Sequence, residues 1–66
     1  MTNFLAHYRK IKHLTQYEVA KMIGVSDVMI SKWETGKIIP INEQLVKLAE
    51  IYEVGIRKLF PDLFGD

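Results

Sequence analysis

Residues 14–37 read LTQYEVAKMIGVSDVMISKWETGK and contain two helix starts separated by a very short turn. Thr15 and Glu18 form the pattern of a capping box, which predicts that a helix begins directly after Thr15. Gly24 predicts the end of that helix, because glycine adopts the positive φ of a helix-ending turn without strain. Ser26 is a favourable N-cap and predicts that another helix begins one residue later. This stretch therefore predicts two consecutive helices.

The turn between these two helices decides how they pack. The helices are predicted at about 16–23 and 27–35, and the turn is too short for antiparallel packing, so they must cross as in a helix-turn-helix. Ala20 is small enough for the second helix to pass over it. Ile30 and Trp33 are three positions apart, which places both on the face that buries the crossing.

The rest of the chain also has helical hydrophobic spacing, and no stretch alternates as a half-buried strand would. We therefore predict an all-α fold: one compact five-helix domain over residues 1–66, with a tail at 61–66. Helices are expected at about 3–12, 16–23, 27–35, 42–52 and 56–60. The inward stripe of the first helix is expected to contain Phe4, Leu5, Tyr8 and Ile11.

Three further helix ends can be predicted from local chemistry. His13 is expected to adopt the left-handed conformation that closes the first helix, since histidine tolerates that region better than most residues. Ile41 has no side-chain acceptor, so Asn42 is expected to cap the fourth helix one residue later. Pro61 is expected to end the fifth helix.

Composition restricts the class of protein. The hydrophobic core of a 66-residue chain stabilises the fold by only roughly 3–5 kcal/mol. Oligomerisation would be a natural further source of stability. The chain contains no cysteine, which excludes disulfides and thiolate metal sites and is compatible with a reducing compartment. No apolar run approaches the ~18–20 residues that span a bilayer. A cytoplasmic protein without a membrane partner is expected.

The charge of the chain is unevenly distributed, although its net value is only +1. Residues 1–37 contain six cationic and three anionic side chains, a balance of +3, whereas residues 38–66 contain three and five, a balance of −2. A domain with one basic half would orient toward a polyanion without binding it strongly and non-specifically.

The ordered set of residues in this chain resembles the helix-turn-helix family of the lambda-type repressors, Cro proteins and restriction-modification controller proteins. The resemblance covers roughly residues 4 to 60 and depends on spaced positions: Arg9, Leu14-Thr15-Gln16, Ala20, Gly24-Val25-Ser26, Ile30-Ser31-Lys32-Trp33-Glu34, Gly36-Lys37, Pro40 and Leu45-Val46-Lys47-Leu48-Ala49. Such a set at fixed offsets is far more specific than a capping box alone. The chain departs from the family pattern at Glu53, where a glycine is usual, and at Arg57 and Lys58, where acidic residues are common.

The resemblance implies roles for individual residues. The helix after Ser26 would enter the major groove, and its base-facing positions would be Asp27, Val28, Met29, Ser31 and Lys32. Phosphate contacts would come from Thr15, Gln16, Thr35 and Lys37. An ion pair between Arg9 and Glu34 would tie the first helix to the third.

Base recognition can also be considered from side-chain chemistry alone. Lys32 can donate to guanine O6 and N7, and Val28 or Met29 can contact a thymine methyl group. Asp27 either accepts a hydrogen bond from cytosine N4 or mainly stabilises the positive end of the helix dipole with its carboxylate. These two interpretations stay open here.

Catalytic and metal sites are not expected. His7 and His13 are six positions apart with no third ligand near them, so surface histidines are the better interpretation. Ser26, His13 and Asp27 are the residue types of a catalytic triad, but no strand-turn-helix elbow accompanies them. Trp33, Tyr8, Tyr52 and Phe4 have helical spacing and are expected in the core rather than stacked on bases.

The C-terminal tail has more apolar bulk than a free terminus should expose. Either the tail folds onto the core or it meets a partner, and of these we expect a homodimer contact formed by Leu59, Phe60, Leu63 and Phe64. The predicted function is therefore sequence-specific binding of double-stranded DNA by a homodimeric repressor or controller at a pseudo-palindromic operator, with no cofactor and no small-molecule ligand. The alternative is a protein-interaction module, an antitoxin or co-regulator, that uses this tail and the loop Ile38-Ile39. An architectural DNA binder fits poorly, since it would need more positive charge and a wedge residue.

Overall fold

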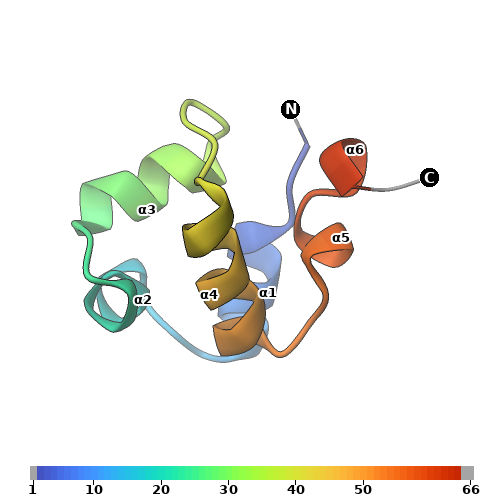
Figure 1. Cartoon of the computed structure of the whole chain (residues 1–66). Helices are drawn as coiled ribbons and strands as arrows, with labels where there is room; N and C mark the ends of the chain where they lie inside the picture. Colours follow the sequence, from blue (N-terminus) through green and yellow to red (C-terminus); the bar gives the residue numbers. More distant parts are fainter. Residues whose placement is uncertain (1, 65–66) are drawn as a thin grey trace.

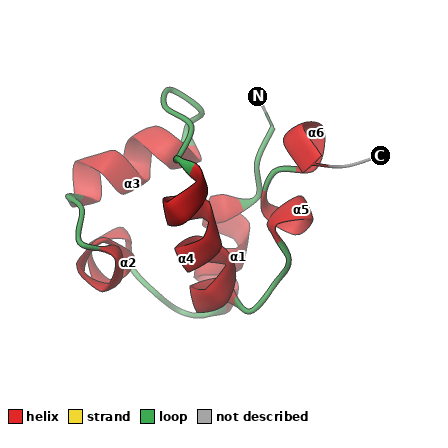
Figure 2. Cartoon of the chain, viewed as in Figure 1, coloured by secondary structure: helices red, strands yellow, loops and turns green. Residues whose placement is uncertain are grey.

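The two helices of the central stretch lie together at one end of the molecule in the computed structural model, which describes residues 2–64 (Figure 1). The six helices of these residues are α1 (Leu5–Ile11), α2 (Gln16–Ile23), α3 (Asp27–Glu34), α4 (Asn42–Tyr52), α5 (Ile56–Leu59) and α6 (Pro61–Phe64). The described part of the chain contains no strand, so the all-α prediction is confirmed (Figure 2). Helices α5 and α6 lie at the opposite end from α2 and α3.

The starts of α2 and α3 form as their cap residues predict. Thr15 Oγ1 accepts from the backbone N–H of Glu18 at 3.0 Å, and Glu18 Oε1 accepts from the backbone N–H of Thr15 at 2.8 Å. Ser26 Oγ accepts from the backbone N–H of Met29 at 3.2 Å. Only Gly24, Val25 and Ser26 separate the two helices, so these caps fix the crossing of α2 and α3.

Helices α1 to α4 all end in the same way. The residue that closes each of them is in the left-handed region: His13 (φ 57°), Gly24 (φ 91°), Gly36 (φ 81°) and Glu53 (φ 56°). The next N–H then reaches back five residues: Leu14 to Arg9, Val25 to Ala20, Lys37 to Lys32 and Val54 to Ala49, at 2.9–3.2 Å. This is the longer bond of the Schellman motif, which satisfies carbonyls that a helix end leaves free.

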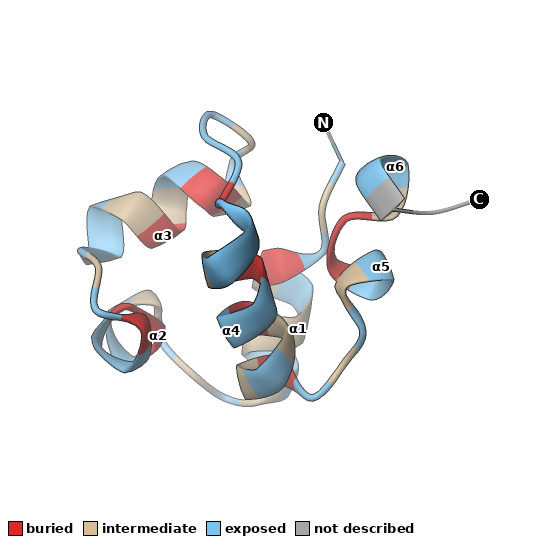
Figure 3. Cartoon of the chain, in the orientation of Figure 1, coloured by how far each residue is buried: buried red, intermediate tan, exposed pale blue. Residues whose placement is uncertain are grey.

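The core lies between α1, α4 and the crossing of α2 and α3, with α5 closing one side (Figure 3). Its buried side chains are Leu5, Val19, Ala20, Ile23, Ile30, Trp33, Leu45, Leu48, Tyr52, Leu59 and Phe60. The predicted crossing residues Ala20, Ile30 and Trp33 are all among them. Among residues 2–64 no helix is both long enough and apolar enough to traverse a bilayer.

The predicted inward stripe of α1 is partly wrong. Leu5 is buried and Tyr8 is half-buried against the core, but Phe4 and Ile11 are exposed. Ile11 follows Leu5 by six positions and therefore lies about 120° around the helix from it, at 3.6 residues per turn. The helix also begins at Leu5 rather than at residue 3, so Phe4 precedes it.

The start of α4 corrects the predicted cap. Ile41, not Asn42, occupies the N-cap position. Gln44 compensates for the missing side-chain acceptor, because its Oε1 accepts from the backbone N–H of Ile41 at 3.0 Å. This is the return half of a capping box, formed without its hydroxyl.

The C-terminal segment also differs from the prediction. Pro61 does not only end α5; it begins α6, because the first position of a helix needs no backbone donor. Leu59 is 0 % exposed and Phe60 is 2 % exposed. Their expected role in a dimer contact is therefore wrong, since both belong to the core of the domain. Leu63 is exposed, and the side chain of Phe64 lies outside the described residues.

Candidate nucleic-acid interface

The outer face of α3 is the surface on which the sequence places base recognition. Val28 is 59 % exposed, and Asp27 and Lys32 are exposed beside it. Ser31 is half-buried, and Met29 is half-buried because it packs against the core. The face therefore presents one carboxylate, one ammonium group and a branched apolar side chain, which can accept, donate and contact a methyl group respectively.

The start of α2 lies beside the last residue of α3, and two of the predicted phosphate ligands, Thr15 and Gln16, are found there. The Thr15 hydroxyl is exposed; it accepts the N–H of Glu18 and keeps its own proton to donate. Gln16 is half-buried, and its Nε2 donates to Glu34 Oε1 at 2.9 Å. The first backbone N–H groups of any helix lack internal acceptors, so this end of α2 has donors for an anion.

The other two predicted phosphate ligands, Thr35 and Lys37, follow directly after α3. Lys37 is exposed, so its ammonium group is free to reach a phosphate. Thr35 uses both of its donors internally, since its N–H and its hydroxyl each donate to Ser31 O at 3.0 Å. A phosphate contact through Thr35 would require its hydroxyl to leave this carbonyl.

The expected ion pair between Arg9 and Glu34 is present. Arg9 Nε lies 2.7 Å from Glu34 Oε2, and Arg9 Nη2 lies 3.2 Å from Glu34 Oε1. Both side chains are largely shielded, at 12 % and 7 % exposure. The hydrogen bond to Glu34 is the main reason that the pKa of Arg9 is raised, partly opposed by burial. Arg9 Nη1 also donates to Leu14 O at 2.8 Å, so one guanidinium group joins α1, the turn before α2 and the end of α3.

Asn3 is a contributor to this region that the sequence analysis missed. Its Nδ2 donates to Trp33 O at 3.1 Å, and its Oδ1 accepts from the backbone N–H of Leu5 at 3.1 Å. Asn3 therefore joins the start of α1 to the last turn of α3. Asparagine before a helical stripe is a capping signal, but no sequence pattern identifies a partner thirty positions away.

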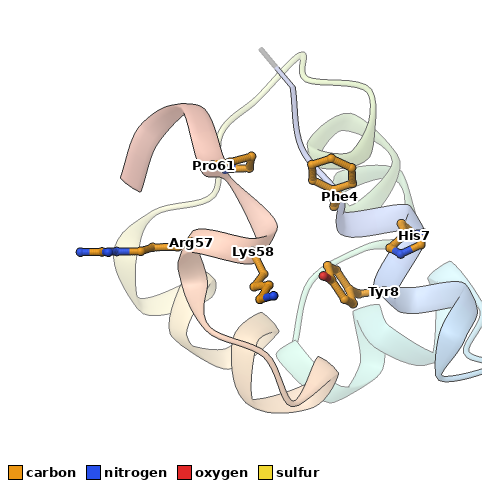
Figure 4. Close-up of a pocket in the computed structure, with 6 residues that line it drawn as sticks. All are labelled: Phe4, His7, Tyr8, Arg57, Lys58 and Pro61. Carbon is orange, nitrogen blue, oxygen red and sulfur yellow. The ribbon is translucent and has the colours of Figure 1, made fainter. Parts of the chain in front are cut away.

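A pocket lies outside the helix-turn-helix, between α1 and the α5–α6 pair (Figure 4). It has a volume of about 310 Å³ and is lined by Phe4, His7, Tyr8, Arg57, Lys58 and Pro61. Phe4 faces Pro61 and Tyr8 faces Lys58, whereas Arg57 points away. None of these lining residues belongs to α2 or α3, so the pocket is not part of the candidate DNA-reading surface.

Comparison with protein families decides the classification. The family model for the helix-turn-helix matches residues 5–59, which is most of the chain. The chain belongs to this helix-turn-helix family. It is of the Cro/C1 type, a class of DNA-binding regulators and not of enzymes.

Individual relatives agree in fold and description. Over 55 residues the chain is 40 % identical to the cryptic phage CTXphi transcriptional repressor RstR of Vibrio cholerae, covering 83 % of this chain and 49 % of that protein. Over 60 residues it is 38 % identical to an uncharacterised helix-turn-helix transcriptional regulator of Methanocaldococcus jannaschii, covering 91 % of both. The crystal structure of the P22 c2 repressor with a synthetic operator superposes with a TM-score of 0.81, at 32 % identity, covering 94 % of this chain and 89 % of that one.

The length of the match differs among relatives. The chain covers about half of the Vibrio repressor and 27 % of the transcriptional activator BcrR of Enterococcus faecalis, to which it is 40 % identical over 55 residues. The shared part is in each case as long as the helix-turn-helix domain.

Proposed function

We propose that the chain binds specific double-stranded DNA by inserting α3 into the major groove and that it regulates transcription as a repressor or controller. The observation that carries this proposal is the outer face of α3: Asp27, Val28 and Lys32 are exposed together on a helix whose inner face is fixed by Ile30 and Trp33. A rigid inner face holds the outer side chains at defined positions, which base recognition requires.

Phosphate contacts would position α3 in the groove. We assign them to Thr15 and Gln16 at the start of α2 and to Lys37 after α3, because each has a donor that the fold leaves free. Thr35 is the least suited of the predicted set, since both of its donors are used within α3. Such contacts fix register and orientation but carry no sequence information.

A repressor is favoured over an activator by the descriptions of two relatives. The Vibrio relative is named a repressor, and the P22 c2 repressor was crystallised with an operator. The activator of Enterococcus shares a similar identity over a smaller part of its length.

The proposed active form is a homodimer. Its contact would use the exposed part of α5 and α6, where Leu63 is 42 % exposed, since Leu59 and Phe60 serve the core. Two-fold symmetry would place two copies of α3 about one turn of DNA apart, roughly 34 Å, on a pseudo-palindromic site.

Selection from random duplex DNA with the purified chain tests the proposed function. The expected product is a pseudo-palindrome whose half-sites are about 10 base pairs apart, as one helical turn requires. Recovery of unrelated sequences after repeated rounds, with equal affinity for random DNA, would contradict sequence-specific binding. A single unrepeated half-site would support reading by α3 but contradict the dimer.

A further inference from the structure

The carboxylate of Glu34 is the junction between the two ends of the helix-turn-helix. Its Oε1 accepts from Gln16 Nε2 at 2.9 Å and from Arg9 Nη2 at 3.2 Å, and its Oε2 accepts from Arg9 Nε at 2.7 Å. Gln16 begins α2 and Glu34 ends α3, so this bond joins the distant ends of the two crossing helices.

We infer that Glu34 is a positioning residue for DNA binding: it holds the Gln16 amide so that one N–H is presented to a DNA phosphate, a role that rests on the function proposed above. Ion pairing with Arg9 accounts for the shielded charge of Glu34 but does not require the bond to Gln16. The additional bond is what connects the ion pair to a phosphate-contacting side chain.

The chemistry of the three groups determines the orientation of the amide. A carboxylate can only accept, so the nitrogen of the Gln16 amide, and not its oxygen, must face Glu34. The amide nitrogen has two N–H groups, of which Glu34 takes one. With the reverse orientation the amide oxygen would face the carboxylate and be repelled. The remaining N–H is thus held in place before any DNA arrives.

Arg9 makes a carboxylate acceptable at this position. An uncompensated carboxylate near a phosphate backbone would weaken binding by repulsion. Arg9 meets both oxygens of Glu34 through two nitrogens, and its third nitrogen donates to Leu14 O at 2.8 Å, just before α2. The same cation therefore neutralises Glu34 and holds the turn from which Gln16 projects.

A double-mutant cycle on DNA affinity tests this role. Gln16→Ala and Glu34→Gln are each expected to weaken binding to the selected site by roughly ten- to a hundredfold, the size expected for loss of one hydrogen bond to a charged group. Because Glu34 acts through Gln16, the double variant is expected to bind no more than about twofold weaker than either single variant. Losses that multiply would overturn the inference.

Two controls separate positioning from stability. Lys37→Ala combined with Glu34→Gln is expected to give losses that multiply, since Lys37 has no bond to Glu34. The free protein supplies a spectroscopic readout: the Gln16 side-chain amide resonances in wild type are expected to be separated and slow to exchange, and to collapse toward those of exposed glutamines in Glu34→Gln. Unchanged resonances would overturn the inference.

Failure of the variant to fold is covered by a conservative substitution. If Glu34→Gln is unfolded at the temperature of the assay, Glu34→Asp keeps the charge facing Arg9 but shortens the reach toward Gln16, and the same cycle applies. If wild type binds no DNA specifically, the proposed function fails; if it binds and the cycle is multiplicative, only the role of Glu34 fails.

Discussion

Asn3 Nδ2 lies 3.1 Å from the backbone oxygen of Trp33, so the segment before α1 is attached to the last turn of the proposed recognition helix. The same segment reaches α5, because the backbone N–H of Phe4 donates to Leu59 O at 2.9 Å. The start of the described chain thus joins the two ends of the molecule and belongs to the structure that holds α3 in place.

Asn3→Ala is expected to lower the free energy of unfolding by about 1–2 kcal/mol, because it removes a capping-type acceptor for Leu5 and a donor for Trp33 O. Urea denaturation measures the change. Asn42→Ala is the matched control, since Asn42 is exposed at the start of α4, where Gln44 supplies the cap bond; a change within about 0.5 kcal/mol is expected there. Equal losses in the two variants would contradict the role of Asn3.

Lys32→Ala and Lys37→Ala are expected to affect DNA binding differently. Lys32 is on the outer face of α3, so its loss should weaken the free energy of binding to the selected site by about 1–3 kcal/mol and relax specificity at one base pair. Lys37 follows α3, so its loss should weaken all sequences alike and reduce the salt slope by about 1. Fluorescence anisotropy on specific and random duplexes at several salt concentrations distinguishes them. The same pattern for both variants would refute the assignment.

Two helix ends give opposite stability predictions. Gly24 has φ 91°, and nothing lies within 4 Å of a Cβ placed there, so Gly24→Ala is strained by backbone conformation alone. This substitution should lower the free energy of unfolding by about 1–2 kcal/mol. His13 has φ 57° and is exposed, so His13→Gly should raise the free energy of unfolding by up to about 1 kcal/mol. Thermal unfolding of both variants tests this pair, and destabilisation by His13→Gly would show that the imidazole has a contact of its own.

The buried side chain of Tyr52 is expected to make the fold less stable at alkaline pH. Burial, with a further contribution from the charge of Glu34, raises the pKa of Tyr52 from 10.0 to about 12. The unfolded chain therefore releases this proton first, so the stabilisation is complete below pH 10 and is lost as pH rises through about 12. The free energy of unfolding of the Tyr52→Phe variant should decline less with pH in this interval than that of the wild type. Urea denaturation at several pH values measures this difference. Identical pH profiles would contradict the assignment.

The same substitution has a second consequence at neutral pH. Among the residues that the structure describes, no group makes a hydrogen bond to Tyr52 Oη, although this oxygen is buried. A buried hydroxyl without a partner is unfavourable, so Tyr52→Phe should be neutral or stabilising at pH 7. A clear loss of stability would indicate that the hydroxyl has a partner in solution.

Local chemistry made the helix-turn-helix predictable. The caps at Thr15 and Ser26 and the left-handed residues His13 and Gly24 depend on neighbours within a few positions, so spacing alone identifies them. Pro61 shows the limit of such signals, since a proline both ends one helix and favours the first position of the next.

Long-range contacts were beyond the sequence pattern. The bond from Gln16 to Glu34 spans 18 positions and that from Asn3 to Trp33 spans 30, and neither follows from periodicity. The apolar residues Leu59 and Phe60 suggested a surface contact only because the path of the chain after α4 was unknown. In the structure α5 begins after Gly55 and these side chains fill the core instead.

Methylation interference on the selected DNA site tests most directly whether α3 reads the major groove. Methylation of guanine N7 modifies the major groove, and methylation of adenine N3 modifies the minor groove. We predict interference at guanine N7 within each half-site, none at adenine N3, and loss of the signal at one guanine in Lys32→Ala. Interference at adenine N3 alone, or an N7 pattern that Lys32→Ala leaves unchanged, would contradict reading by α3.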